Sequence, residues 1–132
     1  MNSSLKVLWV GGLLALTSFI TKPAMADEWN KRTEFTFSGP VEIPGNVLTP
    51  GRYVFEIAKS DSNRNTVLVY AEDSNGKESL ITTILAVPEQ ASKIPDKPIV
   101  QFEERPAGSP EAIHSWFYPG DQTGWEFVYP NS

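Results

Sequence analysis

The only histidine of the chain, His114, could do chemistry with the carboxylates near it in the sequence. Histidine serves as a general base or a metal ligand because its ordinary pKa lies near neutrality. A hydrolase would bring Glu104, Glu111 and Asp121 into one cleft with it. No G-x-S-x-G segment or other motif places a serine nucleophile beside them. A hydrolase therefore stays an alternative, and the sequence predicts a non-enzymatic protein.

Metal binding has little support in the sequence. The chain has no cysteine, so a transition metal at His114 would need carboxylates for all its other ligands, which is uncommon for zinc. Asp61 and Asn63 offer oxygen ligands in one loop, and the segment 73–76 (DSNG) resembles the start of a calcium loop without its closing glutamate. We therefore predict no metal and no cofactor.

Glu103 and Glu104 are adjacent carboxylates at the end of an expected strand. Neighbouring residues of a strand point to opposite faces, so these two cannot act as a catalytic pair on one substrate. We expect Glu103 to be solvated and Glu104 to pair with a cation such as Arg105. That is a structural role.

Aromatic residues gather near the C-terminus, and two interpretations of them stay open. A row of exposed rings would bind sugars or peptides, whereas the same rings could fill the core of a small domain. Strand alternation places His114 on the same face as Trp116. The candidate ligand-binding residues are Trp116, Tyr118, Trp125 and His114. The exposure of Trp116 and Trp125 decides between carbohydrate recognition and a core role.

Residues 1–26 have the three parts of a secretory signal. Lys6 supplies the positive charge, Val7 to Ile20 the apolar run, and Ala24-Met25-Ala26 the cleavage site. The apolar run is shorter than the roughly 20 residues that cross a bilayer as a helix. We predict cleavage after residue 26, a single domain over 27–132, no membrane insertion after cleavage, and a periplasmic or extracellular location.

The predicted domain is acidic. Removing Lys6 and Lys22 leaves nine basic residues against 16 acidic ones, a net charge of −7. Such a surface repels phosphate backbones and anionic headgroups, which argues against nucleic acid as a partner. We expect a glycan, a cell-wall polymer or an envelope protein as the partner.

Alternating apolar residues predict an all-β fold, a single antiparallel β-sandwich of about eight strands of the Ig-like, transthyretin-like or jelly-roll type. The predicted strands are 32–37, 41–43, 52–58, 66–71, 80–87, 99–104, 112–118 and 125–129. Asn75-Gly76 predicts a type I′ hairpin turn, and Pro44-Gly45, Pro50-Gly51 and Pro119-Gly120 predict type II turns. Residues 89–98 are the expected long connection between the sheets.

Two sets of segments carry a resemblance to known proteins. The segment 48–55 (LTPGRYVF) resembles a turn-and-strand pattern of Ig-like and transthyretin-like modules. Segments 35–45, 102–110 and 116–121 together resemble a group of small exported bacterial β-sandwich proteins of uncharacterised function. The resemblance implies export and a β domain, but no activity and no site residues. The expected function is a non-enzymatic binding or envelope-associated module.

Overall fold

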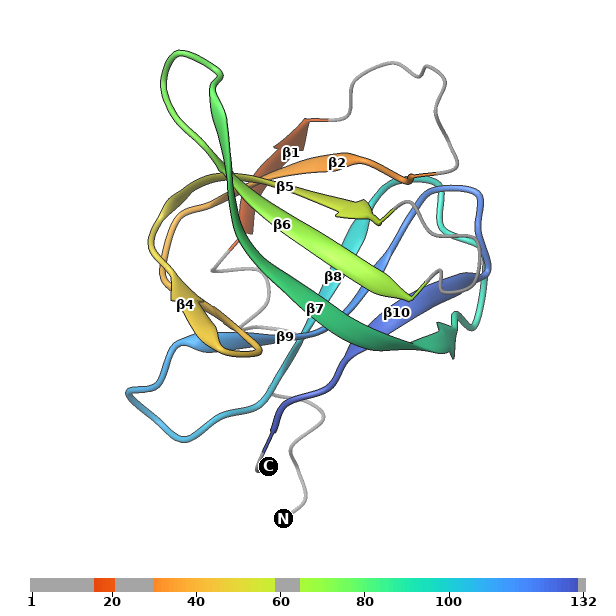
Figure 1. Ribbon diagram of the computed structural model, residues 1–132. Coiled ribbons are helices and arrows are strands. Elements are labelled where there is room, and N and C mark those ends of the chain that lie inside the picture. The colour runs from red at the N-terminus through yellow and green to blue at the C-terminus, as the bar shows by residue number, and fades with distance from the viewer. Residues whose placement is uncertain (1–15, 21–29, 59–64, 131–132) are drawn as a thin grey trace.

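The computed structural model describes residues 16–20, 30–58 and 65–130, which form an all-β fold (Figure 1). The strands are β1 (Leu16–Ile20), β2 (Thr33–Phe37), β3 (Val41–Ile43), β4 (Asn46–Leu48), β5 (Gly51–Ile57), β6 (Thr66–Glu72), β7 (Glu78–Gln90), β8 (Ile99–Glu103), β9 (Glu111–Phe117) and β10 (Thr123–Phe127). Within these ranges no helix is long and apolar enough to cross a membrane.

The strands form one continuous mixed sheet, in the order β1-β2-β5-β6-β7-β10-β9-β3-β4, with β8 on β9. The predicted pair of separate sheets is not confirmed, because the 13-residue β7 pairs with β6 over its first part and with β10 over its last. All described pairs are antiparallel except β3 with β9, which is parallel. We call β1, β2, β5 and β6 the first half, and β10, β9, β8, β3 and β4 the second half.

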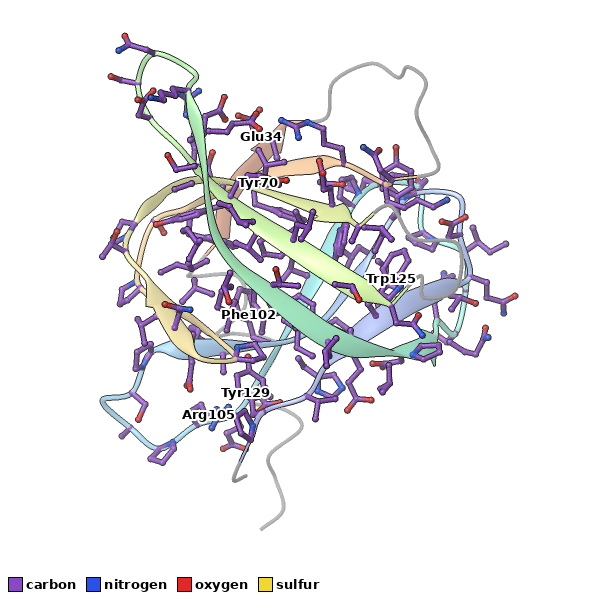
Figure 2. The ribbon with its side chains drawn as sticks, in the orientation of Figure 1. Glu34, Tyr70, Phe102, Arg105, Trp125 and Tyr129 are labelled. Carbon is purple, nitrogen blue, oxygen red and sulfur yellow. The ribbon has the colours of Figure 1, made fainter. Side chains whose placement is uncertain are left out.

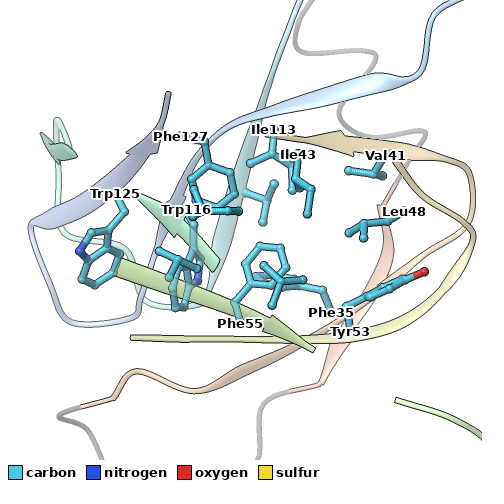
Figure 3. Packing of buried hydrophobic residues seen from close by; sticks show 14 of the residues in the cluster. Phe35, Val41, Ile43, Leu48, Tyr53, Phe55, Ile113, Trp116, Trp125 and Phe127 are labelled. Atoms are coloured by element: carbon cyan, nitrogen blue, oxygen red, sulfur yellow. The ribbon is translucent and has the colours of Figure 1, made fainter. Parts of the chain in front are cut away.

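The sheet curls so that its two halves pack face to face around the core (Figure 3). The strands alternate as expected for half-buried strands, with Phe35 and Phe37 inside on β2. Phe55 of β5 reaches across the core, with ring centroids 5.6 Å from Trp116 and 6.0 Å from Phe127. Aromatic rings thus hold the two halves together without disulfides.

All eight predicted strands are present, with shifts of a few residues at their ends. The short β4 and the strand β1 were not predicted. β1 lies inside the predicted signal and pairs with β2, from Leu16 opposite Phe37 to Ile20 opposite Glu34. The rest of residues 1–26 lies outside the described part, so the signal and its cleavage stay predictions.

The hairpin at Asn75-Gly76 is confirmed, but its predicted turn type is wrong. Among these two only Gly76 has a positive φ, of 84°, whereas a type I′ turn needs two such residues. The amide of Gly76 donates to the Asp73 carbonyl, and the Asp73 carboxylate accepts from the amides of Asn75 and Lys77. The Asp73 carboxylate therefore stabilises the turn by accepting backbone hydrogen bonds. Asp61 and Asn63, the other calcium candidates, lie outside the described residues.

Two of the three predicted Pro-Gly turns have the expected glycine conformation. Gly45 and Gly120 both have φ of 86°, close to the value that a type II turn needs. Gly51 differs from these two glycines. Its φ is 155°, which is not the value of a type II turn, and it is the first residue of β5.

Tyr129 ties the C-terminal segment to the second half. Its hydroxyl lies 2.6 Å from the carbonyl of Ile113 and 3.1 Å from that of Glu42. The guanidinium of Arg105 lies over its ring, 4.9 Å from the centroid, and Figure 2 shows the two side chains together. Burial raises the pKa of the Tyr129 phenol well above its usual value, and the nearby carboxylates of Glu103 and Glu42 act in the same direction.

Candidate functional site

His114 is the extra residue of a β-bulge in β9. The pairing of β8 with β9 passes from Gln101–Ser115 directly to Phe102–Ile113, which leaves His114 without a partner in the ladder. The bulge lets Ile113 and Trp116 both face the core. The prediction that His114 shares a face with Trp116 is therefore wrong, because simple alternation does not hold across a bulge.

His114 lies on the outer face of the second half, which points away from the core and continues from β8, β9 and β10 onto the last part of β7. Its Nδ1 lies 3.4 Å from Oε1 of Glu103, and its Nε2 lies 3.4 Å from Oε1 of Glu89. All three side chains are half-buried, between 27% and 34% exposed. Glu103 comes from β8 and Glu89 from β7, so strand pairing brings together residues far apart in sequence.

A third carboxylate, Glu126 of β10, completes this cluster. It lies between the core residues Trp125 and Phe127, so its side chain points outward. One ligand atom each of Glu89, His114 and Glu126 can be chosen so that all lie within 4.8 Å of one another. We call these three residues the His114 cluster.

Glu103 links the His114 cluster to Arg105. One Arg105 nitrogen lies 2.9 Å from Oε2 of Glu103 and 3.9 Å from Glu42. Glu104 is exposed. The expectation that Glu103 is solvated and Glu104 is paired with Arg105 is therefore wrong. Glu103 is the ion-paired carboxylate, because it shares the outer face with Arg105 and His114.

A groove opens beside the His114 cluster, between the connection that follows β7 and side chains of β8 and β9. It has a volume of about 590 Å³ and is lined by residues 89–96 with Ile99, Gln101 and Phe117. Two backbone hydrogen bonds hold the connection in place, from Ala91 to the Gln122 carbonyl and from Gly120 to the Pro95 carbonyl. A connection without strands is thus present over 91–98 and forms one wall of the groove, but it joins β7 and β8 of one continuous sheet, so the predicted role as a link between two sheets is not confirmed.

Phe117 packs over Gly124 on the floor of the groove. A Cβ atom at Gly124 would overlap the Phe117 ring and lie 2.5 Å from the Trp116 carbonyl oxygen. Phe117 is 3% exposed, and at the rim Ile94 and Ile99 are 57% and 36% exposed. The groove therefore combines an aromatic floor with accessible aliphatic side chains.

The tryptophans proposed as a ligand platform are core residues. Trp116 is fully buried and Trp125 is 7% exposed, with ring centroids 5.0 Å apart. Tyr118 is half-buried, and the Lys31 ammonium lies 5.3 Å from its ring centroid. The assignment of Trp116 and Trp125 to a binding surface is therefore corrected, because a small domain uses its large rings to fill its core. Of the four candidates, His114 has the clearest site geometry.

The three carboxylates that the hydrolase alternative requires do not lie beside His114. Glu104 is exposed, and Asp121 forms an ion pair of 2.8 Å with Lys31. Glu111 begins β9 opposite Val41, and burial raises the pKa of its carboxyl. The carboxylates beside His114 are instead Glu89, Glu103 and Glu126. Sequence reasoning missed Glu89 and Glu126 as site residues, although the pattern Trp125-Glu126-Phe127 indicates an outward carboxylate.

Comparison of the chain with protein-family profiles, curated proteins and solved structures gives no match. The resemblance to small exported bacterial proteins therefore stays a prediction.

Proposed function

We propose that the protein is an exported, non-enzymatic binding module that holds a short peptide segment of an envelope protein in the groove. In this proposal the curled sheet serves as a sandwich-like scaffold, and the connection 91–98 covers the ligand from one side. The observation that carries the proposal is the groove of about 590 Å³ on the outer face. Sites of this size hold drug-sized ligands, comparable with a tripeptide.

The lining chemistry favours a peptide with apolar side chains and one basic side chain. Phe117, Ile94 and Ile99 offer apolar contact, and Gln101 offers an amide for backbone groups. Glu89 and Asp96 line the groove together with one cation, Lys93, so the lining has a net charge of −1 on a domain with a predicted net charge of −7, and charge complementarity favours a basic side chain. A flat sugar platform has less support, since Trp116 and Trp125 are buried.

The test uses a defined peptide and two matched variants. Acetyl-Leu-Lys-Leu-amide is titrated into the ¹⁵N-labelled protein produced from the full chain, with acetyl-Leu-Glu-Leu-amide as the charge control. We expect amide shifts confined to residues 89–101 and Phe117, with a Kd below about 1 mM for the lysine peptide. The variant Asp96→Asn should weaken binding of the lysine peptide but not binding of the glutamate peptide.

Ile94 and Val47 form the matched pair, because they are 57% and 54% exposed. Ile94→Ser removes apolar contact at the rim of the groove without adding charge and should raise the Kd at least fivefold, whereas Val47→Ser on β4 should leave it unchanged. Equal effects of the two variants, or no amide shifts with either peptide, would contradict the proposal.

A further inference from the structure

We propose that the His114 cluster, made of Glu89, His114 and Glu126, binds a divalent transition-metal ion of the Zn²⁺ type. The inference goes beyond the peptide groove and does not depend on it. It replaces the expectation from sequence that no metal binds, which was based on the absence of cysteine and of a second histidine. The structure assigns the missing ligands to Glu89 and Glu126.

The spacing of the donor atoms fits one ion. The Nε2 of His114 and Oε1 of Glu89 are 3.4 Å apart. Two ligands of a tetrahedral zinc site with bonds of about 2.1 Å are separated by roughly this distance. Glu126 offers a third oxygen within 4.8 Å of the other two atoms, and rotation of its side chain can shorten that distance.

Glu89 provides an independent indication of a cation. Its Oε1 has essentially no solvent exposure and accepts no hydrogen bond within the described residues. The contact with His114 at 3.4 Å does not meet hydrogen-bond geometry. An enclosed carboxylate oxygen without a donor is unfavourable by about 1–3 kcal/mol or more, and a metal ion would supply the missing partner.

Glu103 prepares the imidazole for coordination. An ionised carboxylate only accepts hydrogen bonds, so its contact with Nδ1 favours the tautomer that carries the proton there. The lone pair of Nε2 then faces Glu89. Arg105 holds the other oxygen of Glu103 at 2.9 Å. A carboxylate behind a histidine ligand is the usual arrangement around protein-bound zinc.

The donor set decides the class of metal. One imidazole nitrogen suits Zn²⁺, Ni²⁺ or Cu²⁺, whereas Ca²⁺ prefers six to eight oxygen ligands, as general coordination chemistry indicates. Three protein ligands leave at least one position for water. Each ligand comes from a different strand of one sheet, β7, β9 or β10, so strand pairing positions the three ligands.

The experiment uses the protein produced from the full chain without a polyhistidine tag, after treatment with a chelator. Zn²⁺ is titrated by calorimetry and followed by the Cε1–H NMR signal of His114, the only histidine of the chain. We expect one Zn²⁺ per chain, a shift of this signal, and no competition from a hundredfold excess of Ca²⁺.

Variants separate a built site from simple surface binding. Glu89→Gln, Glu126→Gln and His114→Asn should each lower the Zn²⁺ affinity at least tenfold, and Glu103→Gln should lower it tenfold to a hundredfold. Glu104→Gln is the matched control, since it removes an exposed carboxylate next to Glu103, and should leave the affinity unchanged. The dispersion of the NMR spectrum verifies that each variant is folded.

Two outcomes would overturn the inference. One is an unchanged His114 signal in the presence of excess Zn²⁺. The other is equal Zn²⁺ affinity in the parent protein, Glu89→Gln and Glu126→Gln, which would mean that the histidine binds the ion alone. Ile94→Ser should not alter Zn²⁺ affinity, so failure of the metal site and failure of the peptide groove are distinguishable.

Discussion

One carboxylate oxygen of Glu103 lies 3.4 Å from Nδ1 of His114, and the other forms an ion pair of 2.9 Å with the guanidinium of Arg105. An arginine, a glutamate and a histidine thus form a chain of contacts along the outer face. The bulge in β9 makes this possible, because it turns His114 outward while Trp116 stays in the core. The orientation of the imidazole is therefore set by its neighbours in the sheet.

We expect His114 to carry its proton on Nδ1 in its neutral form. Long-range ¹H–¹⁵N spectra above neutral pH report the tautomer, and Glu103→Gln should lower the Nδ1–H population because a neutral amide oxygen is a weaker acceptor than a carboxylate. Glu104→Gln serves as the control and should have no effect. A dominant Nε2–H form in the unmodified protein would contradict this prediction.

Gly124→Ala should destabilise the protein by about 3 kcal/mol, because the new methyl group would overlap the Phe117 ring and the Trp116 carbonyl. Gly39→Ala is the matched change, since no atom lies within 4 Å of a Cβ there and its φ is not positive. Urea unfolding measures both free energies of unfolding. Similar losses for the two variants would show that Phe117 does not need the space above Gly124.

The free energy of unfolding should decrease at high pH because of the phenol of Tyr129. Its pKa in the folded protein is raised above the ordinary value of 10.0, so the unfolded chain loses this proton first. The free energy of unfolding is then unaffected by this group below pH 10 and falls above it, by up to about 1.4 kcal/mol per pH unit.

Urea unfolding between pH 8 and pH 11 checks this dependence, with Tyr129→Phe as the comparison. The variant loses the hydrogen bond to the Ile113 carbonyl and should be less stable by about 1 kcal/mol at pH 8. Its stability should also fall less steeply above pH 10. Parallel pH curves for the two proteins would exclude Tyr129 as the source.

The emission of Trp116 and Trp125 should be that of buried indoles. A Trp9→Phe, Trp29→Phe variant leaves these two as the only tryptophans. We expect a blue-shifted emission maximum and weak quenching by iodide, with a shift to the red and stronger quenching after unfolding in urea. Strong iodide quenching of the folded variant would contradict burial and would support the alternative in which Trp116 and Trp125 form an exposed binding surface.

Local patterns were enough to predict eight of the ten strands. The alternation of Phe35 and Phe37, and of Tyr53, Phe55 and Ile57, reflects burial on one face, and all five side chains lie in the core. The continuity of the sheet was not predictable in the same way. The predicted strand ends at residue 87, yet β7 continues through Pro88 to Gln90, because β6 no longer pairs with β7 beyond Leu85 and Pro88 needs no amide hydrogen on that edge.

The His114 cluster could not be assembled from the sequence, because its members meet only through strand register. Glu126 lies opposite Val87 and Ser115, and Glu89 lies opposite Gly124, which depends on pairing between β7, β10 and β9. The bulge leaves one local trace: Ile113 and Trp116 are large apolar residues three positions apart in a strand. Regular alternation would place only one of them in the core.

The parallel pairing of β3 with β9 also determines how the chain can fold. Val41 pairs with Glu111, about 70 residues later, whereas β6 and β7 are neighbours joined by a tight hairpin. Closing so long a loop is entropically unfavourable until most of the sheet exists, and folding slows as contacts become less local. We expect the β6–β7 hairpin to form early and the β3–β9 contact to form last, so the chain remains open at this end for most of its folding time.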